Sequence, residues 1–215
     1  MANYIPALGF RWLTPLYDPV LRLTLRERRF KGALVTQVAL KPGHRALDLG
    51  CGTGTLTLLL QQSCPGARVS GLDGDPEVLE IAQRKAAAAG VALDLRQGMS
   101  FDPPFAAASF DRVVSSLLLH HLTTDDKRRT LAAALALLRP GGELHLADWG
   151  RAANPLMRAA YLGIQLLDGF ATTADNVRGL LPDLMRGAGF TDVEETRRFS
   201  TVFGSLSLYR AARPA

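Results

Sequence analysis

One stretch of sequence decides the fold: RALDLGCGTGTLTLLL at residues 45–60. An apolar run of strand length leads into three glycines spaced GxGxG, and an apolar run of helix length follows them. Glycines let the backbone approach a ligand closely, and the start of a helix offers N–H groups to it. The spacing differs from the GxGxxG of dinucleotide folds and from the GxxxxGK[ST] of phosphate-binding loops. The stretch therefore predicts a strand, a ligand-binding turn and a helix.

Strand-length and helix-length segments alternate from this point onward, which favours βαβ units and a mostly parallel sheet. We expect strands at residues 45–49, 68–72, 91–96, 110–116, 143–147, 191–197 and 206–213. We expect helices at residues 56–62, 76–89, 124–139 and 176–187. Asp75 is the expected N-cap of the second helix, and Pro140-Gly141-Gly142 should end the third.

Composition limits the class of protein. A chain of 215 residues with 47% hydrophobic content is long enough for one α/β domain and too short for two. No segment reaches the roughly 18 to 20 apolar residues that cross a bilayer, so we expect a cytoplasmic protein. Cys51 and Cys64 lack the spacing of a zinc site or a disulfide framework. The net charge of +5 is compatible with nucleic acid, acidic lipid or anionic substrates and selects none of them.

Four motifs in order resemble the class I methyltransferases that depend on S-adenosylmethionine (SAM). They are DLGCGTG at 48–54, GLDGDPEVL at 71–79, SFDRVVSSLLLHHL at 109–122 and LRPGGELHLADW at 138–149. The resemblance implies an α/β, Rossmann-like fold: a seven-stranded sheet, parallel except for the last strand, with helices on both faces. It also implies methyl transfer from SAM with S-adenosylhomocysteine (SAH) as product. The pattern is most similar to the ubiquinone and menaquinone C-methyltransferases.

The resemblance implies a set of cofactor contacts. Asp48 and the glycine turn should hold the methionine part, with the turn's N–H groups facing its carboxylate. An acidic residue closing the second strand can accept hydrogen bonds from both ribose hydroxyls, which is the role expected of Asp73. Where many members place an acid against adenine, this chain has Met99. The full expected set is Tyr17, Asp48, Gly50, Cys51, Gly52, Asp73, Gly74, Met99, Ser100, Ser116 and Leu117.

The end of the fourth strand should face the transferred methyl group. His120 and His121 follow it, and a histidine there could accept a proton from a phenol or enol. Adjacent side chains usually point in different directions, so at most one of the pair should act as the base. Metal-dependent O-methyltransferases cluster carboxylates at the ends of strands four and five, whereas this chain offers Asp148 alone. We therefore expect no catalytic metal.

The remaining expectations concern layout and acceptor. The single domain, 1–215, should contain an N-terminal helical cap at 1–40, the SAM-binding core at 41–150, a substrate-cap insertion at 151–175, and a helix and strands at 176–215. Apolar segments at 10–18 and 156–170 favour a lid over a small quinol-like or lipid-like acceptor. Arg22, Arg26 and Arg29 share a helical face that could meet anionic lipid, and a homodimer stays open. No nucleic-acid partner is expected, although methylation of RNA or protein and noncatalytic SAM binding remain alternatives.

Overall fold

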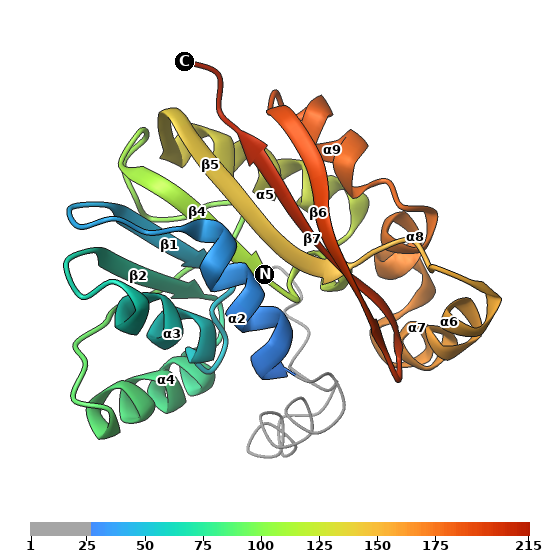
Figure 1. Ribbon diagram of the computed structural model, residues 1–215, viewed down its shortest axis with the longest axis horizontal. Coiled ribbons are helices and arrows are strands. Elements are labelled where there is room, and N and C mark those ends of the chain that lie inside the picture. The colour runs from blue at the N-terminus through green and yellow to red at the C-terminus, as the bar shows by residue number, and fades with distance from the viewer. Residues whose placement is uncertain (1–26) are drawn as a thin grey trace.

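The computed structural model describes residues 27–215, which contain one seven-stranded sheet. The strands lie in the order β3-β2-β1-β4-β5-β7-β6. All neighbouring pairs are parallel except β5 with β7 and β7 with β6, so β7 alone runs against the others (Figure 1). The predicted fold class is confirmed.

The strands are β1 Arg45–Leu49, β2 Arg68–Asp73, β3 Asp94–Gln97, β4 Phe110–Ser116, β5 Leu138–Trp149, β6 Thr191–Thr201 and β7 Gly204–Ala212. The helices are α2 Glu27–Val38, α3 Thr55–Ser63, α4 Pro76–Ala88, the short 3-10 helix η3 Leu119–His121, α5 Thr124–Leu137, α6 Pro155–Ala160, α7 Leu162–Asp168, α8 Phe170–Arg178 and α9 Leu181–Gly187. Asp75 caps α4 as predicted, because its side chain accepts a hydrogen bond from the Glu77 amide at 2.8 Å.

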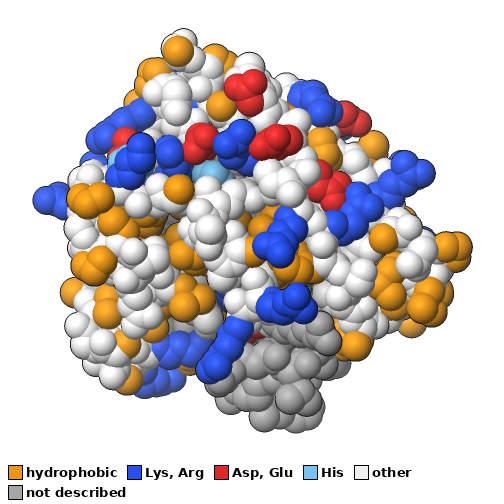
Figure 2. All heavy atoms as spheres, in the orientation of Figure 1, with side chains coloured by type: hydrophobic (Ala, Val, Ile, Leu, Met, Phe, Trp, Pro, Cys, Tyr) orange, Lys and Arg blue, Asp and Glu red, His pale blue; other side chains and the backbone are white. Residues whose placement is uncertain are grey.

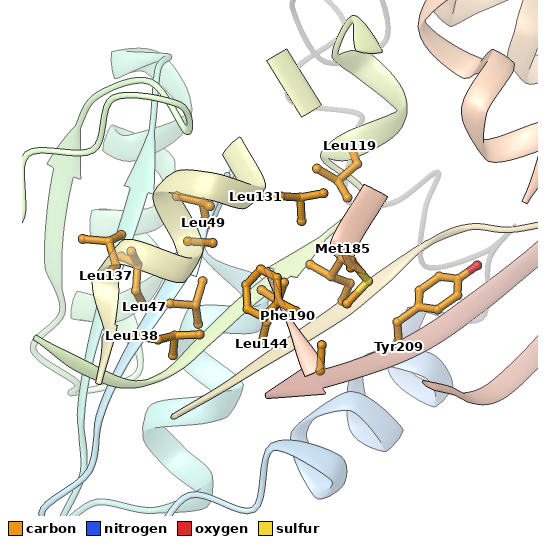
Figure 3. Packing of buried hydrophobic residues seen from close by; sticks show 14 of the residues in the cluster. Leu47, Leu49, Leu119, Leu131, Leu137, Leu138, Leu144, Met185, Phe190 and Tyr209 are labelled. Atoms are coloured by element: carbon orange, nitrogen blue, oxygen red, sulfur yellow. The ribbon is translucent and has the colours of Figure 1, made fainter. Parts of the chain in front are cut away.

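Helices cover both faces of the sheet. On one face α2 and α3 pack against the strands, and α4 lies beside α3 (Figure 1). On the other face α5 and α9 contribute Leu131, Leu137 and Met185 to a cluster with strand residues such as Leu47 (Figure 3). Alternation along β1 sends Leu47 toward α5 and its neighbours Ala46 and Asp48 toward α2 and α3. The strand that leads into the glycine turn is thereby fixed from both sides.

Several predicted boundaries were wrong: β6 extends to Thr201, α8 begins at Phe170, and three further differences involve a glycine. The third strand starts at Asp94, not residue 91, because Gly90 and Val91 close α4: Val91 N–H bonds to Ala86 O and Gly90 N–H to Ala87 O. This is a Schellman ending with Gly90 at φ 66°. Residues 176–187 form two helices because Gly179, at φ 74°, ends α8 in the same way.

The Pro140-Gly141-Gly142 segment also differs from expectation. It does follow α5, but α5 already ends at Leu137 and the segment lies inside β5. Phe110 pairs with Leu138 and Arg112 with Glu143, so extra residues of β5 bulge outward between these two pairs. Gly141 adopts φ 72° there, which a glycine allows without strain. The fifth strand is thus longer at both ends than the predicted 143–147.

The segment after β5 turns away from the sheet as α6, α7 and α8 (Figure 1). It carries several exposed apolar side chains, and Figure 2 shows hydrophobic side chains gathered over this part of the molecule. They are Leu156, Leu162, Leu166, Leu167 and Phe170, with Val202 on the β6–β7 hairpin. Among residues 27–215, none of the helices combines the length and the apolar composition needed to cross a bilayer.

Three residues of the predicted N-terminal segment, Tyr17, Arg22 and Arg26, lie outside the described residues, and Arg29 is exposed on α2.

Candidate functional site

A pocket opens at the C-terminal ends of the parallel strands, where the strand order reverses between β1 and β4. Open α/β sheets bind ligands at this switch point. The lining comes from α2, from the loops after β1 to β4 and from α4. It comprises Lys31, Gly50, Cys51, Gly52, Thr53, Leu72, Asp73, Gly74, Val78, Gly98, Met99, Ser100, Ser116, Leu117, Leu118, His121 and Leu122.

The glycine turn is shaped by close contacts. Gly50 has φ 73°, and a Cβ built on it would lie 2.8 Å from a methyl group of Leu118. Gly52 has φ 52°, but a Cβ there would meet no atom of residues 27–215 within 4 Å. Positive φ favours glycine at both positions, and the side chain of Leu118 would also have to move if Gly50 carried a Cβ.

One expectation about this turn was wrong. Its N–H groups were predicted to face a ligand carboxylate, yet most of them bond to the protein. The amides of Gly50 and Cys51 both donate to Leu72 O, at 2.8 and 2.9 Å, and Gly54 N–H donates to Cys51 O. Gly52 N–H donates to the carboxylate of Asp73 at 2.8 Å. These amides hold the turn in place, so a bound anion needs another partner.

Asp73 closes β2 beside this turn. Its carboxylate also accepts a hydrogen bond from Asp75 N–H at 3.0 Å. A carboxylate has about four lone-pair positions, so these two bonds leave acceptor capacity for a ligand in the pocket. Burial raises the pKa of Asp73, although the backbone hydrogen bonds partly offset this.

Asp48 is buried on β1, directly behind the turn. Thr57 of α3 donates a hydrogen bond to its Oδ2 at 2.7 Å, while the buried Oδ1 has no partner among residues 27–215. Burial raises the pKa of Asp48 to about 6, against the opposing effects of the Thr57 hydrogen bond and the charge of Lys31. A buried carboxylate oxygen without a partner is costly, and a cationic ligand group would compensate it.

Lys31 is a pocket residue that the sequence patterns did not identify. It lies on α2, lines the pocket and pairs with Glu27 one helical turn earlier, with Nζ 2.5 Å from Oε1. Its charge acts on Asp48, as the pKa of that residue shows. Lys31 belongs to none of the sequence motifs that predicted the site. Its one feature in the sequence is a glutamate four residues earlier, and such pairs are common on the exposed faces of helices, so they do not indicate a binding site.

The opposite end of the pocket is lined by Gly74, Val78, Met99 and Ser100. The Ser100 hydroxyl bonds to Thr130 of α5 at 2.9 Å, which uses one of its three hydrogen-bonding positions. The thioether of Met99 and the side chain of Val78 present an apolar surface there. Cys51 also lines the pocket, and burial raises the pKa of its thiol well above the ordinary value. It is therefore a neutral packing group.

Between these two ends lie Ser116, Leu117 and His121, all at the end of β4. Leu117 adopts φ 58°, a rare conformation for a residue with a side chain, and turns the chain from β4 into η3. Burial and the neighbouring charge of His120 lower the pKa of His121 well below its ordinary value. His121 is neutral near pH 7, so one ring nitrogen offers a lone pair.

Of the two predicted catalytic histidines, only His121 lines the pocket. His120 does not line the pocket; its Nδ1 lies 2.8 Å from Oδ1 of Asp148, deep beneath η3. Asp148 also accepts hydrogen bonds from the amides of Leu119 and Trp149 and from the side chain of Asn176. Burial lowers the pKa of His120, but the charges of Asp148 and Asp168 outweigh it, so the net shift is upward.

Asp168, at the end of α7, was not predicted as a site residue. Its carboxylate lies 3.6 Å from Nε2 of His120 and 3.5 Å from Nδ1 of His121. Burial raises the pKa of Asp168, and the charge of His120 opposes this. The segment at residues 151–175 therefore brings a carboxyl group to the two histidines, a contact across more than 40 residues of sequence that no local pattern signals.

Comparison with known proteins agrees with this geometry. A family described as "Methyltransferase domain" matches residues 46–142. An uncharacterized methyltransferase, sll0829 of Synechocystis, is 32% identical over 94% of this chain and 92% of its own length. A demethylmenaquinone methyltransferase of Thermus thermophilus is 36% identical, over 65% of this chain and 64% of its own length.

Solved structures share the fold. The SAM-dependent methyltransferase SibL superposes with a TM-score of 0.68 at 23% identity, over 88% of this chain and 56% of its own. Phospholethanolamine N-methyltransferase 2 of Haemonchus contortus, solved with SAH, gives 0.70 at 15% identity over 87% of this chain and 53% of its own. Fold, pocket position and relatives agree: the chain belongs to the class I SAM-dependent methyltransferases.

Proposed function

We propose that this methyltransferase acts in the cytoplasm on a small hydrophobic or amphipathic acceptor of the quinol type. The observation that carries the proposal is the polarity of the pocket. The lining includes two charged groups, Lys31 and Asp73, and it includes the leucines that flank His121 in the sequence, Leu117, Leu118 and Leu122. A nucleoside amino acid fits the first set, and an apolar ring fits the second.

The amino-acid end of SAM matches Asp48 and Lys31. The unpartnered Oδ1 of Asp48 is a suitable acceptor for the ammonium group, and the Lys31 ammonium suits the carboxylate. Gly52 fits the same picture, because open space lies where its Cβ would be. The nucleoside end matches Asp73 for the ribose hydroxyls and Met99 with Val78 for the two faces of adenine.

When bound, SAM supplies a methyl group on a positively charged sulfur. The residues of this chain hold and align the two reactants, and proximity of this kind contributes most of the rate of such a transfer. Leu117, Leu118 and Leu122 keep water away from the acceptor side of the pocket. His121 is the polar side chain next to these leucines, so it is the expected contact of the acceptor's hydroxyl group.

Support for a quinol-type acceptor comes from the relatives and from the cap. Several relatives carry names from menaquinone and ubiquinone biosynthesis, among them the Thermus protein above. The exposed leucines of α6 and α7 form an apolar surface (Figure 2), and α7 ends at Asp168, which lies 3.5 Å from the pocket residue His121. Peripheral membrane contact, a homodimer and the absence of a nucleic-acid partner stay predictions.

The first prediction concerns Asp73. Asp73→Ala removes the acceptor for the ribose hydroxyls, and hydrogen bonds to a charged group contribute about 1.5–3 kcal/mol each. We expect SAH to bind at least about tenfold more weakly by calorimetry. Asp125→Ala, at a side chain that is 86% exposed on α5, is the control and should bind like wild type. An Asp73→Ala affinity within twofold of wild type would contradict the assignment.

The second prediction uses the pKa of Asp48. Because burial raises it from 3.8 to about 6, the folded protein binds this proton more tightly than the unfolded chain. Stability from this group is therefore present below pH 4 and lost as the pH rises to 6. Asp48→Asn should raise the free energy of unfolding at pH 8 by about 1–3 kcal/mol relative to wild type, with a smaller gain at pH 4.5.

The same variant should bind SAH more weakly at pH 8, since its side chain no longer carries the charge that attracts the ammonium group. In wild type, SAH affinity should fall as the pH drops below about 6, where Asp48 becomes protonated. Urea denaturation and calorimetry measure the two effects separately. An Asp48→Asn protein that is both less stable and unchanged in affinity at pH 8 would refute this role for the carboxylate.

The third prediction tests whether Lys31 contacts the amino-acid end of the cofactor and not its nucleoside end. Lys31→Met should weaken SAH, which carries the carboxylate, by about tenfold, the usual size for one charged contact. The affinity for 5′-methylthioadenosine, which lacks the amino-acid part, should not change. Equal losses for both ligands would show that Lys31 shapes the pocket and does not bind the carboxylate.

The fourth prediction concerns the acceptor. Radiolabelled SAM is incubated with the full chain and either a short-chain demethylmenaquinol, catechol, bulk RNA or a mixture of proteins. We expect label in the quinol, and at least about tenfold less of it with Asp73→Ala at a SAM concentration well below saturation. Label in RNA or protein instead would replace the proposed acceptor class, and tight SAH binding without any product would favour a noncatalytic protein.

A further inference from the structure

Three side chains that can bind metal converge beside the pocket: His120, His121 and Asp168. One ligand atom of each lies within 4.8 Å of the others. The two histidines come from η3 and the aspartate from the end of α7, so the cluster joins the core of the enzyme to its cap segment. The two imidazole rings lie against each other, with centroids 4.0 Å apart and planes tilted by 39°.

The separations in this cluster do not fit hydrogen bonds. Asp168 lies 3.6 Å from Nε2 of His120 and 3.5 Å from Nδ1 of His121, whereas charge-assisted hydrogen bonds between N and O measure about 2.7–2.9 Å. Among residues 27–215, Nδ1 of His121 is buried without a hydrogen-bond partner, and no hydrogen bond reaches the Asp168 carboxylate. Ligand atoms at 2.0–2.2 Å from a tetrahedral ion are separated from each other by about 3.3–3.6 Å. The distances from His120 to Oδ2 of Asp168 and from His121 to Oδ1 of Asp168 both lie at the upper end of this range.

The far side of His120 has the arrangement common behind metal ligands. Its Nδ1 lies 2.8 Å from Asp148, so the ring can donate its proton there and keep the Nε2 lone pair directed at the cluster. A carboxylate that orients a ligating histidine in this way is the usual outer partner of a metal site. Asp148 is itself held by the Leu119 and Trp149 amides, so the ring orientation is fixed in advance.

Asp168 is held in position as well. The helix that follows it, α8, is tied to the core by Asp175, which accepts hydrogen bonds from Thr124 at 2.7 Å and from Lys127 at 3.1 Å. Asn176 of α8 donates to Asp148 and to Trp149 O. Because α8 is fixed to α5 and β5, the Asp168 carboxylate, two residues before α8, is already held beside the two histidines before an ion binds. A preorganised ligand set of this kind binds an ion with little loss of entropy.

We propose that His120, His121 and Asp168 bind one divalent first-row transition-metal ion, with an open coordination position facing the pocket through His121. Two imidazoles and a carboxylate suit Zn²⁺, Co²⁺ or Fe²⁺ better than Mg²⁺ or Ca²⁺, which prefer oxygen. The open position would take a hydroxyl oxygen of the acceptor, and this part rests on the proposed function. The prediction that no metal binds rested only on the ends of strands four and five, whereas Asp168 lies at the end of α7.

The test is metal binding by the full chain, free of any histidine tag and stripped with chelator. Zn²⁺ is titrated by calorimetry, and Co²⁺ is followed by its visible absorption. We expect one ion per chain in wild type. Asp168→Asn and His121→Ala should each weaken binding at least about tenfold, while His44→Ala, outside the cluster, should bind as tightly as wild type. Outer-shell changes at metal sites cost about 10–100-fold, so Asp148→Asn should also weaken it.

SAH titration of the same samples separates this inference from the proposed function. If wild type binds SAH but no Zn²⁺ at about 100 μM, or if Asp168→Asn and His121→Ala bind the ion as tightly as wild type, the metal site is refuted and the cofactor pocket stands. In that case the cluster is an ion pair between His120 and its two carboxylates. If wild type fails to bind SAH, the proposed function fails independently of the metal result.

Discussion

The site depends on one junction, where the turn after β1 is hydrogen-bonded to the end of β2. Leu72 O and the Asp73 carboxylate together accept the amides of Gly50, Cys51 and Gly52. Because these amides are used within the turn, the proposed function assigns recognition of the cofactor's ends to charged side chains. Asp48 lies in the interior beside this turn, and residues 27–215 provide no hydrogen-bond partner for its Oδ1. A buried carboxylate oxygen without a partner lowers the stability of the ligand-free fold, and loss of stability of this kind is common at binding sites.

Much of the fold could be predicted because its signals are local. The central strands β1 and β4 appear with the predicted bounds, and Asp75 begins α4 as its side chain indicates. The wrong boundaries arose at residues whose type is common in one kind of element but which belong to another element in this structure. Val91 is apolar and β-branched, which suits a strand, but its amide completes the end of a helix. Gly179 interrupts what reads as one helix, since a positive φ is cheap only for glycine.

The pocket was predictable only where motifs reach it. Gly50, Asp73, Met99 and Leu117 line it as the resemblance implied, because motifs at the ends of neighbouring strands meet at one edge of a sheet. His120 was expected at the reaction centre and instead lies behind His121, where its Nδ1 faces Asp148. Lys31 and Asp168 lie in segments without motifs, and only tertiary packing brings them to the site. Tyr17 lies outside the described residues, so its role stays a prediction.

The two outer strands, β3 and β6, have a consequence for the behaviour of the molecule among its copies. β3 is four residues long, and Arg96 on it covers the ring of Phe105 at 4.5 Å. β6 is longer, but its pairing with β7 shifts register twice and its exposed face carries Glu194 and Arg197. Neither edge strand is therefore a flat, uncharged strand whose free backbone groups could pair with another chain. Aggregation by adding strands side by side is therefore disfavoured at both borders of the sheet.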